Sequence, residues 1–136
     1  MGSGFTVVCS NCGWDETYGL GIGMMYYPGN NELLTKLAPQ RQRNRVRALL
    51  SESPPNIISY WHGLYVCPQC NTLHKRFYIM IEKDSCTLYE THFRCARCRS
   101  TLVEVCEDIE DMDVTTYNCR CCGQQTLEKT LEMYWD

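Results

Sequence analysis

The chain has 136 residues, of which 44% are hydrophobic and 21% charged, and its formal net charge is −3. This length fits one ordinary domain or two very small ones, and the hydrophobic fraction excludes wholesale disorder. The negative balance excludes a global positive field, so binding of nucleic acid would require a local basic patch.

The amino-terminal segment is predicted to form two strands on either side of a cysteine motif. Phe5 to Val8 is the first strand, and Asp15 to Tyr27 is the second. Alternation along the second strand puts Gly19, Gly21 and Gly23 on one face. This flat face predicts that another element packs against it.

A helical insert is expected at about residues 31–51. A short helix is predicted from Glu32 to Ala38, and Pro39 suits the first turn of a second helix that runs to about Ser51. Pro54 and Pro55 end the helical part.

The remainder of the chain is predicted to be strands and turns. The expected strands end or begin close to cysteine motifs, and the last one closes the chain. They are Leu64 to Val66, Arg76 to Ile81, Thr87 to Phe93, Thr101 to Cys106, Val114 to Asn118 and Leu127 to Trp135. The sequence therefore predicts a small β-rich fold of antiparallel strands with one short helical insert.

Eleven cysteines are far more than an ordinary share, and eight of them form four C-x-x-C motifs. The pairs are Cys9 and Cys12, Cys67 and Cys70, Cys95 and Cys98, and Cys119 and Cys122. A turn with this spacing aims two thiolates at one point, and two such turns complete a tetrahedral shell of four sulfurs. The sequence predicts two such sites that staple the fold, with redox dithiols or disulfides as the alternative.

Zinc is the expected metal, with two ions per chain, because closed sites of four thiolates are typical of zinc. Iron remains possible, since Cys67-Pro68-Gln69-Cys70 resembles a rubredoxin turn. Gly13, Asn71 and Gly123 follow three of the motifs and tolerate the positive φ that the turn requires. Arg99 follows the remaining motif and breaks this pattern.

Three cysteines lie outside the predicted ligand set. Cys86 and Cys106 are expected to be ordinary side chains, whereas Cys121 can replace Cys122 as a ligand. Gly123 favours Cys122. The three histidines could in principle substitute as ligands; they are His62, His74 and His92.

The spacing leaves the pairing of the motifs open. Pairing in sequence order leaves 54 and 20 residues between partners, whereas a nested arrangement leaves 24 between the second and third motifs and joins the first to the fourth. We prefer the sequence-order pairing. It predicts a first zinc ribbon at residues 1–86, which contains the helical insert, and a second at residues 87–136.

A C-x-x-C motif near the amino terminus is followed by a helical segment, and then by Cys67-Pro68-Gln69-Cys70 and an aliphatic strand. In this order residues 5–81 resemble the bacterial CpXC-domain proteins, a family without an established function. The first motif lacks the proline of that family. The resemblance implies pairing in sequence order and supplies no activity, and the second half resembles zinc ribbons in general.

Localisation is predicted to be cytoplasmic, with no membrane partner. No stretch approaches the roughly 18 apolar residues of a membrane-spanning helix, and the amino terminus lacks the features of a secretory signal. Thiols are reduced in the cytosol, which favours metal ligation over disulfides.

A binding module is the first functional hypothesis, with nucleic acid or a protein as the partner. The candidate phosphate-binding residues lie around the second and third motifs; they are Lys75, Arg76, Arg94, Arg97 and Arg99. Four arginines in the insert, at positions 41, 43, 45 and 47, straddle two flanks of a helix and form no single stripe.

An enzyme is the second hypothesis, and rubredoxin-like electron transfer through iron is the third. A nucleophile would have to be Cys86, Cys106 or Cys121, with one of the three histidines as its base, and no spacing brings such a pair together. Four complete motifs also predict closed sites without the open position of a catalytic zinc. We therefore expect a protein without catalytic activity.

Overall fold

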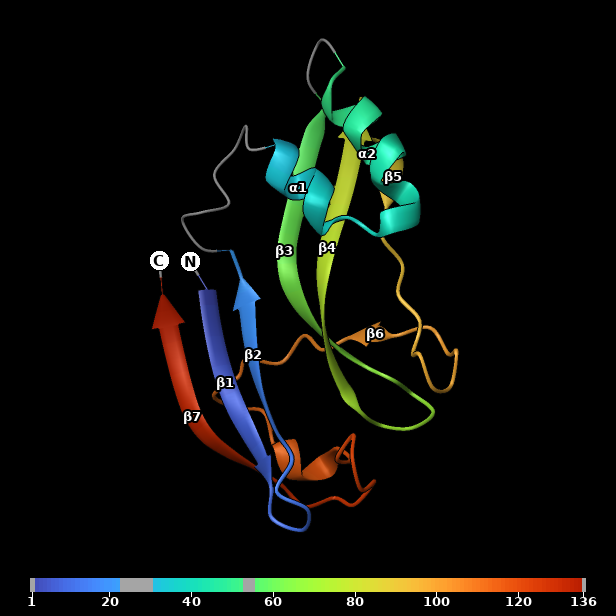
Figure 1. Ribbon diagram of the computed structural model, residues 1–136. Coiled ribbons are helices and arrows are strands. Elements are labelled where there is room, and N and C mark those ends of the chain that lie inside the picture. Colours follow the sequence, from blue (N-terminus) through green and yellow to red (C-terminus); the bar gives the residue numbers. More distant parts are fainter. Residues whose placement is uncertain (1, 23–30, 53–55, 136) are drawn as a thin grey trace.

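The computed structural model describes residues 2–22, 31–52 and 56–135, and its main element is an antiparallel sheet (Figure 1). The strand order is β5-β4-β3-β2-β1-β7, and β6 pairs with β3 beside this path. The strands are β1 (Gly2–Cys9), β2 (Asp15–Gly21), β3 (Ile57–Val66), β4 (Leu73–Lys83), β5 (Cys86–Glu90), β6 (Val103–Glu104) and β7 (Leu127–Trp135). The helices are α1 (Asn31–Leu37) and α2 (Arg43–Leu50), with short 3-10 turns η2 (Gln40–Gln42) and η3 (Val114–Thr116).

The predicted β-rich antiparallel fold with a short helical insert is confirmed. The predicted last strand has the observed bounds of β7, and the predicted second helix is a 3-10 turn followed by α2. The end of the predicted second strand, beyond Ile22, and the prolines at positions 54 and 55 lie outside the described residues.

One predicted strand is wrong. Residues 114–116 form the 3-10 turn η3, because the Asp113 carboxylate accepts a hydrogen bond from the Thr115 backbone N–H at 3.0 Å. This cap favours a turn over an extended strand. It also leaves Val114 buried under the sheet.

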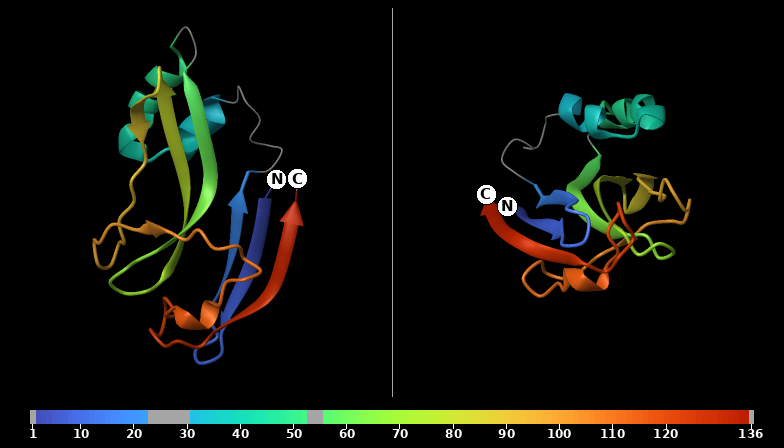
Figure 2. Two further views of the ribbon diagram at one scale, coloured as in Figure 1. Left: turned by 180° about the vertical axis from the view of Figure 1, so that it is seen from behind. Right: turned by 60° about the horizontal axis from the view of Figure 1, so that its bottom comes forward.

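The sheet has two parts that meet at a narrow junction (Figure 1, Figure 2). Strands β1, β2 and β7 form one part, and β3, β4 and β5 form the other, where α1 and α2 lie. Among the residues that the structure describes, only Gly21 and His62 pair between β2 and β3. By contrast, β1 pairs with β2 from Gly2 to Val8 and with β7 from Gly2 to Cys9. Pairing of β1 with β7 brings the two ends of the described chain side by side.

Of the predicted glycine face, Gly19 lies against the indole of Trp135 from β7, and Gly23 lies outside the described residues. An added Cβ at Gly19 would lie 3.5 Å from this ring, and one at Gly4 would lie 3.1 Å from it. At Gly4 the added atom would also lie 2.8 Å from the Tyr18 carbonyl oxygen. The glycines of β1 and β2 therefore allow the close approach of an aromatic side chain.

The helical part of the sheet has its own hydrophobic core, whereas a second core spans the junction, because Leu64 of β3 and Leu73 of β4 join the residues of β1 and β2. In the helical part, Leu34 and Val46 from the two helices pack on Ile79 and Ile81 of β4. In the other part, Phe5, Val7 and Tyr18 pack on residues from the loops before β7, among them Ile109, Met112 and Val114. Within the described residues, no helix has both the length and the apolar character needed to cross a membrane.

Because β4 is buried against the helices, shortening one of its buried side chains should lower the free energy of unfolding strongly. Replacing Ile79, which is fully buried, with alanine is expected to lower the free energy of unfolding by about 3 kcal/mol, because it leaves a cavity. The matched control is Leu131→Ala on β7, whose side chain is 54% exposed and whose loss should cost less than about 0.5 kcal/mol. Urea unfolding of the metal-loaded chain measures both values, and equal costs would contradict the packing of α1 and α2 on β4.

Candidate metal centres

All four C-x-x-C motifs form the same backbone loop. In each loop, the residue after the second cysteine donates its N–H to the carbonyl oxygen of the first cysteine at 2.8 to 2.9 Å. These donors are Gly13, Asn71, Arg99 and Gly123, and all four have a positive φ. Arg99, with φ of 58°, therefore departs from the pattern in residue type and not in conformation.

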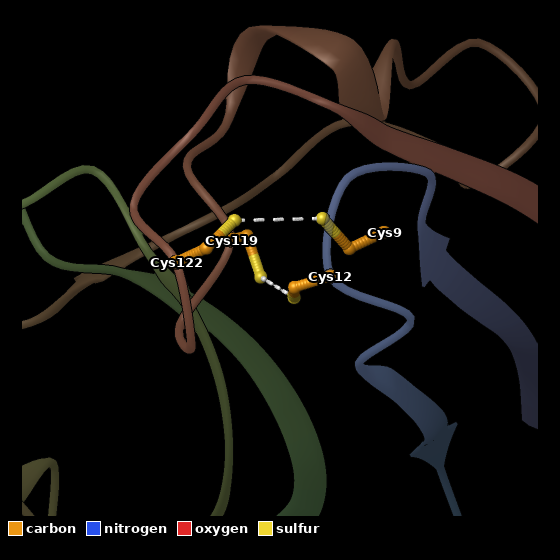
Figure 3. Close-up of side chains that lie close together, drawn as sticks. All are labelled: Cys9, Cys12, Cys119 and Cys122. Carbon is orange, nitrogen blue, oxygen red and sulfur yellow. Dashed lines mark hydrogen bonds between the residues drawn. The ribbon is translucent and has the colours of Figure 1, made fainter.

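The loops bring eight sulfurs together in two groups of four. The terminal group comprises Cys9, Cys12, Cys119 and Cys122, and the central group comprises Cys67, Cys70, Cys95 and Cys98. In each group all four Sγ atoms lie within 4.8 Å of one another. Figure 3 shows the four side chains of the terminal group pointing toward a common centre.

The sulfur separations suit a metal ion better than a disulfide. In the terminal group Cys9 Sγ lies 3.6 Å from Cys122 Sγ, and Cys12 Sγ lies 3.6 Å from Cys119 Sγ. Zn–S bonds of about 2.3 Å in a tetrahedron place sulfurs about 3.8 Å apart, whereas a disulfide requires about 2.05 Å. Both groups can hold a metal ion, and the identity of that ion does not follow from these distances.

The sequence-order pairing is wrong, and the motifs pair in the nested arrangement. The first and fourth loops meet because β1 pairs with β7, and the Ser10 N–H continues this contact by donating to the Thr126 carbonyl at 2.9 Å. The second and third loops meet beside the pairing of β3 with β6. Both groups therefore join cysteines from the predicted segments 1–86 and 87–136.

Hydrogen-bond donors surround the sulfurs in both groups. The Thr126 hydroxyl lies 3.0 Å from Cys9 Sγ, and the Thr72 hydroxyl lies 3.1 Å from Cys70 Sγ. The Asn11 side-chain amide donates to Cys122 Sγ at 3.5 Å. Such donors favour the charged thiolate that a metal requires.

The thiols within one group differ in pKa. The Thr126 hydroxyl lowers the pKa of Cys9 to about 6. Burial opposes ionisation of Cys70, but hydrogen bonds from Thr72 and neighbouring cysteines outweigh it and lower the pKa to about 7. In the same group, burial and contacts with other cysteines raise the pKa of Cys98 to about 12. Four negative sulfurs in this space therefore need a cation between them.

Among the described residues, the remaining cysteines and the histidines lie outside both groups. Cys86, Cys106 and Cys121 are all exposed, and Cys122 holds the position that Cys121 could have taken. His74 Nε2 lies 2.9 Å from the Thr72 hydroxyl, and His92 lies 3.7 Å from Glu90.

The candidate phosphate-binding residues do not share one face. Arg76 and Arg97 line one pocket near the central group, whereas Lys75 lies on the opposite face of β4 by strand alternation. Arg94 pairs with Thr101 across the third loop, and the Arg99 side chain is exposed.

Sequence reasoning missed Arg120, which lines the same pocket as Arg76 and Arg97. It lies inside the fourth loop, as Arg97 lies inside the third. This shared position in the sequence could have indicated that Arg120 belongs with Arg97. The Arg97 guanidinium donates to the Arg120 carbonyl at 2.9 Å. Burial, together with Arg120, Arg76 and Arg97, lowers the pKa of His74 to about 4.

Direct hydrogen bonds connect the loops of the two groups. The Asn118 side-chain amide donates to the Cys70 carbonyl at 2.9 Å, and the Asn71 side-chain amide donates to the Thr116 carbonyl at 2.7 Å. The backbone N–H of Asn118 also donates to the Asn71 carbonyl at 2.8 Å. The two groups are therefore neighbours within one scaffold.

Comparison of the chain with protein-family models, with curated proteins and with solved structures finds no match. The case for metal in the two groups accordingly rests on the ligand types and on the arrangement of the sulfurs.

The nested arrangement makes a prediction for pairs of substitutions. Changing Cys12 and Cys122 to serine together opens only the terminal group, so the double variant should retain one bound ion. Changing Cys12 and Cys70 together opens both groups and should leave none. Sequence-order pairing predicts the reverse, and elemental analysis of the purified proteins distinguishes the two.

The controls are Cys86→Ser and Cys106→Ser, whose side chains are exposed and belong to neither group. Both variants should keep the metal content of the unchanged chain. A loss of metal in either one would contradict the ligand assignment.

Proposed function

We propose that this chain is a non-enzymatic zinc-ribbon protein in which two structural zinc ions, one per cysteine group, hold a binding module together. The observation that carries the proposal is the convergence of four sulfurs in each group. Closed sites of four thiolates leave no open position for a substrate or an activated water. The predicted CpXC-like relationship and the cytoplasmic location belong to the same proposal, although the sequence-order pairing that the resemblance implies differs from the nested groups observed.

Zinc is favoured over iron because it is the usual occupant of closed tetrathiolate sites. The alternative is a rubredoxin-like electron-transfer protein, since iron accepts the same four ligands. A purified sample separates the two, because an iron form is red with visible charge-transfer bands and a zinc form is colourless.

We expect two zinc ions per chain, and their removal by a chelator should unfold most of the sheet. Metal binding and folding are coupled in such sites, because the ligands converge only in the folded chain. Circular dichroism during chelation, with metal analysis before and after, measures this effect. A fully reduced chain that stays folded with one ion or none would contradict the proposal.

Nucleic acid is the partner that the basic residues favour. Arg76 and Arg97 lie together with Arg120, although the whole chain carries a net charge of −3. A local patch of this kind attracts phosphates where the global field does not. Arg94 and Arg99 are exposed in or beside the same third loop and add positive charge there.

Binding to nucleic acid should therefore weaken steeply as salt is raised. Changing Arg94, Arg97 and Arg99 together to glutamine should reduce the salt slope of log K by up to about three, since each lost phosphate contact removes about 0.9. The matched control changes Arg41, Arg45 and Arg47, which alters the net charge equally but leaves this patch intact. Fluorescence anisotropy with single- and double-stranded DNA and RNA provides the slopes, and equal slopes for the two triple variants would rule out the patch.

A protein partner is the second candidate, and a different pocket favours it. A hollow of about 290 Å³ is lined by the aromatic side chains Trp61, Tyr65 and Tyr78 and by the carboxylates Glu90 and Glu104. The carboxylates repel phosphate. Aromatic rings beside carboxylates suit a basic side chain of a partner protein. If titrations with all four nucleic acids are flat at low salt, this candidate is the one that remains.

A further inference from the structure

A second, smaller pocket lies between the two cysteine groups and has a volume of about 150 Å³. Its three arginines come from separate elements: Arg76 from β4, Arg97 from the third loop and Arg120 from the fourth loop. His74 and Thr72 line the same pocket. Residues far apart in sequence thus place three guanidinium groups around one space.

The positive charge of these arginines has no carboxylate partner in the described part of the chain. The ion pairs found there join Lys36 to Glu32, His92 to Glu90, and Lys129 to Glu132. Arg76 donates to the Lys75 carbonyl at 2.8 Å, and Arg97 donates to the Arg120 carbonyl at 2.9 Å. Each guanidinium carries five N–H donors, so most donors are available to a ligand.

His74 supplies an independent indication of a ligand. Its side chain is only 4% exposed, and its Nε2 lies 2.9 Å from the Thr72 hydroxyl. Its Nδ1 is buried and has no hydrogen-bond partner among the described residues. Folded proteins rarely leave a buried polar atom unpaired, so His74, which lines the pocket, lacks one polar partner.

We propose that this pocket binds one tetrahedral oxyanion of the phosphate type, held by Arg76, Arg97 and Arg120 beside His74. The inference deepens the nucleic-acid proposal and rests on it for the source of the anion, which is then a backbone phosphate. Free inorganic phosphate shares the same chemistry and is the other source. The pocket is too small for a phosphate together with its base and sugar, so the anion enters as a protruding group.

The bound anion selects one tautomer of His74. With the proton on Nδ1, the ring donates to an anion oxygen, and Nε2 accepts a hydrogen bond from the Thr72 hydroxyl. The same hydroxyl lies 3.1 Å from Cys70 Sγ. Anion binding therefore withdraws a hydrogen bond from a sulfur of the central group, which connects the pocket to the metal ligand.

A competing explanation assigns the arginines to charge balance alone. Two tetrathiolate zinc centres each carry a net charge of −2, and Cys70 and Cys95 line the pocket. On that explanation the pocket has no ligand, and phosphate acts only through ionic strength.

The test titrates inorganic phosphate into the zinc-loaded full chain at constant ionic strength, with chloride as the reference salt. NMR follows the backbone amides around Thr72, Arg97 and Arg120, and the ring nitrogens of His74. We expect saturable shifts in phosphate only, with the Nδ1–H tautomer of His74 increasing as the pocket fills. Shifts that are linear in concentration and equal in chloride would overturn the inference.

Arg120→Gln is the decisive variant, because its side chain is exposed and its loss should not unfold the chain. It should weaken phosphate binding about tenfold or more, since a charged hydrogen-bond donor is lost. Arg41→Gln removes the same charge from the helical insert and should leave phosphate binding unchanged. Metal analysis must give two zinc ions for both variants. Unchanged binding in the Arg120 variant would reject the pocket.

A short DNA strand distinguishes the two sources of the anion. Displacement of phosphate by the strand supports a backbone phosphate in the pocket. If phosphate binds and the strand does not, the pocket stands with free phosphate as its ligand and the nucleic-acid proposal fails. If the strand binds without displacing phosphate, the nucleic-acid proposal stands and the pocket is rejected as its contact.

Discussion

The convergence of four sulfurs on one point, which occurs twice, is the constraint on which the rest of the structure depends. Among the described residues the two parts of the sheet share one strand pair, Gly21 with His62, and Leu64 of β3 and Leu73 of β4 join the core of the other part. The helical part has a separate small core. Cores of this size supply little stability without an added staple. The central group lies beside the longer strands, and the terminal group fixes the loops at the ends of β1 and β7. Hydrogen bonds between Asn71 and the segment before the fourth loop hold the two groups together.

Local signals in the sequence were sufficient to predict the cysteines of the two groups and most elements. The C-x-x-C spacing identified the eight cysteines that form the two groups, and the apolar pattern located the helical insert and β7. The close packing at Gly19 was also predictable, because alternating glycines in a strand favour the close approach of another element. What it packs against, Trp135, lies at the far end of the described chain and carried no local signal.

The pairing of the motifs could not be predicted because it depends on contacts between distant strands. Spacers of 20 and 24 residues are equally acceptable for a zinc ribbon, so length did not decide. The pairing of β1 with β7 decided it, and strand pairing over such a separation leaves no trace in either segment alone. Arg99 shows a related limit, since the shape of the loop imposes a left-handed conformation on a residue type that rarely adopts it.

The nested arrangement has a consequence for the order in which the sites assemble. Cys70 and Cys95 are 25 positions apart, whereas Cys12 and Cys119 are 107 positions apart. Closing the longer loop from the unfolded chain costs about 1 kcal/mol more free energy, because more conformational entropy is lost. This difference favours formation of the central group first. Once that group has formed, it shortens the effective loop that the terminal group must close. Synthesis of the chain imposes the same order, because the first loop leaves the ribosome long before the fourth loop is made. Until then the first loop is an open pair of thiols.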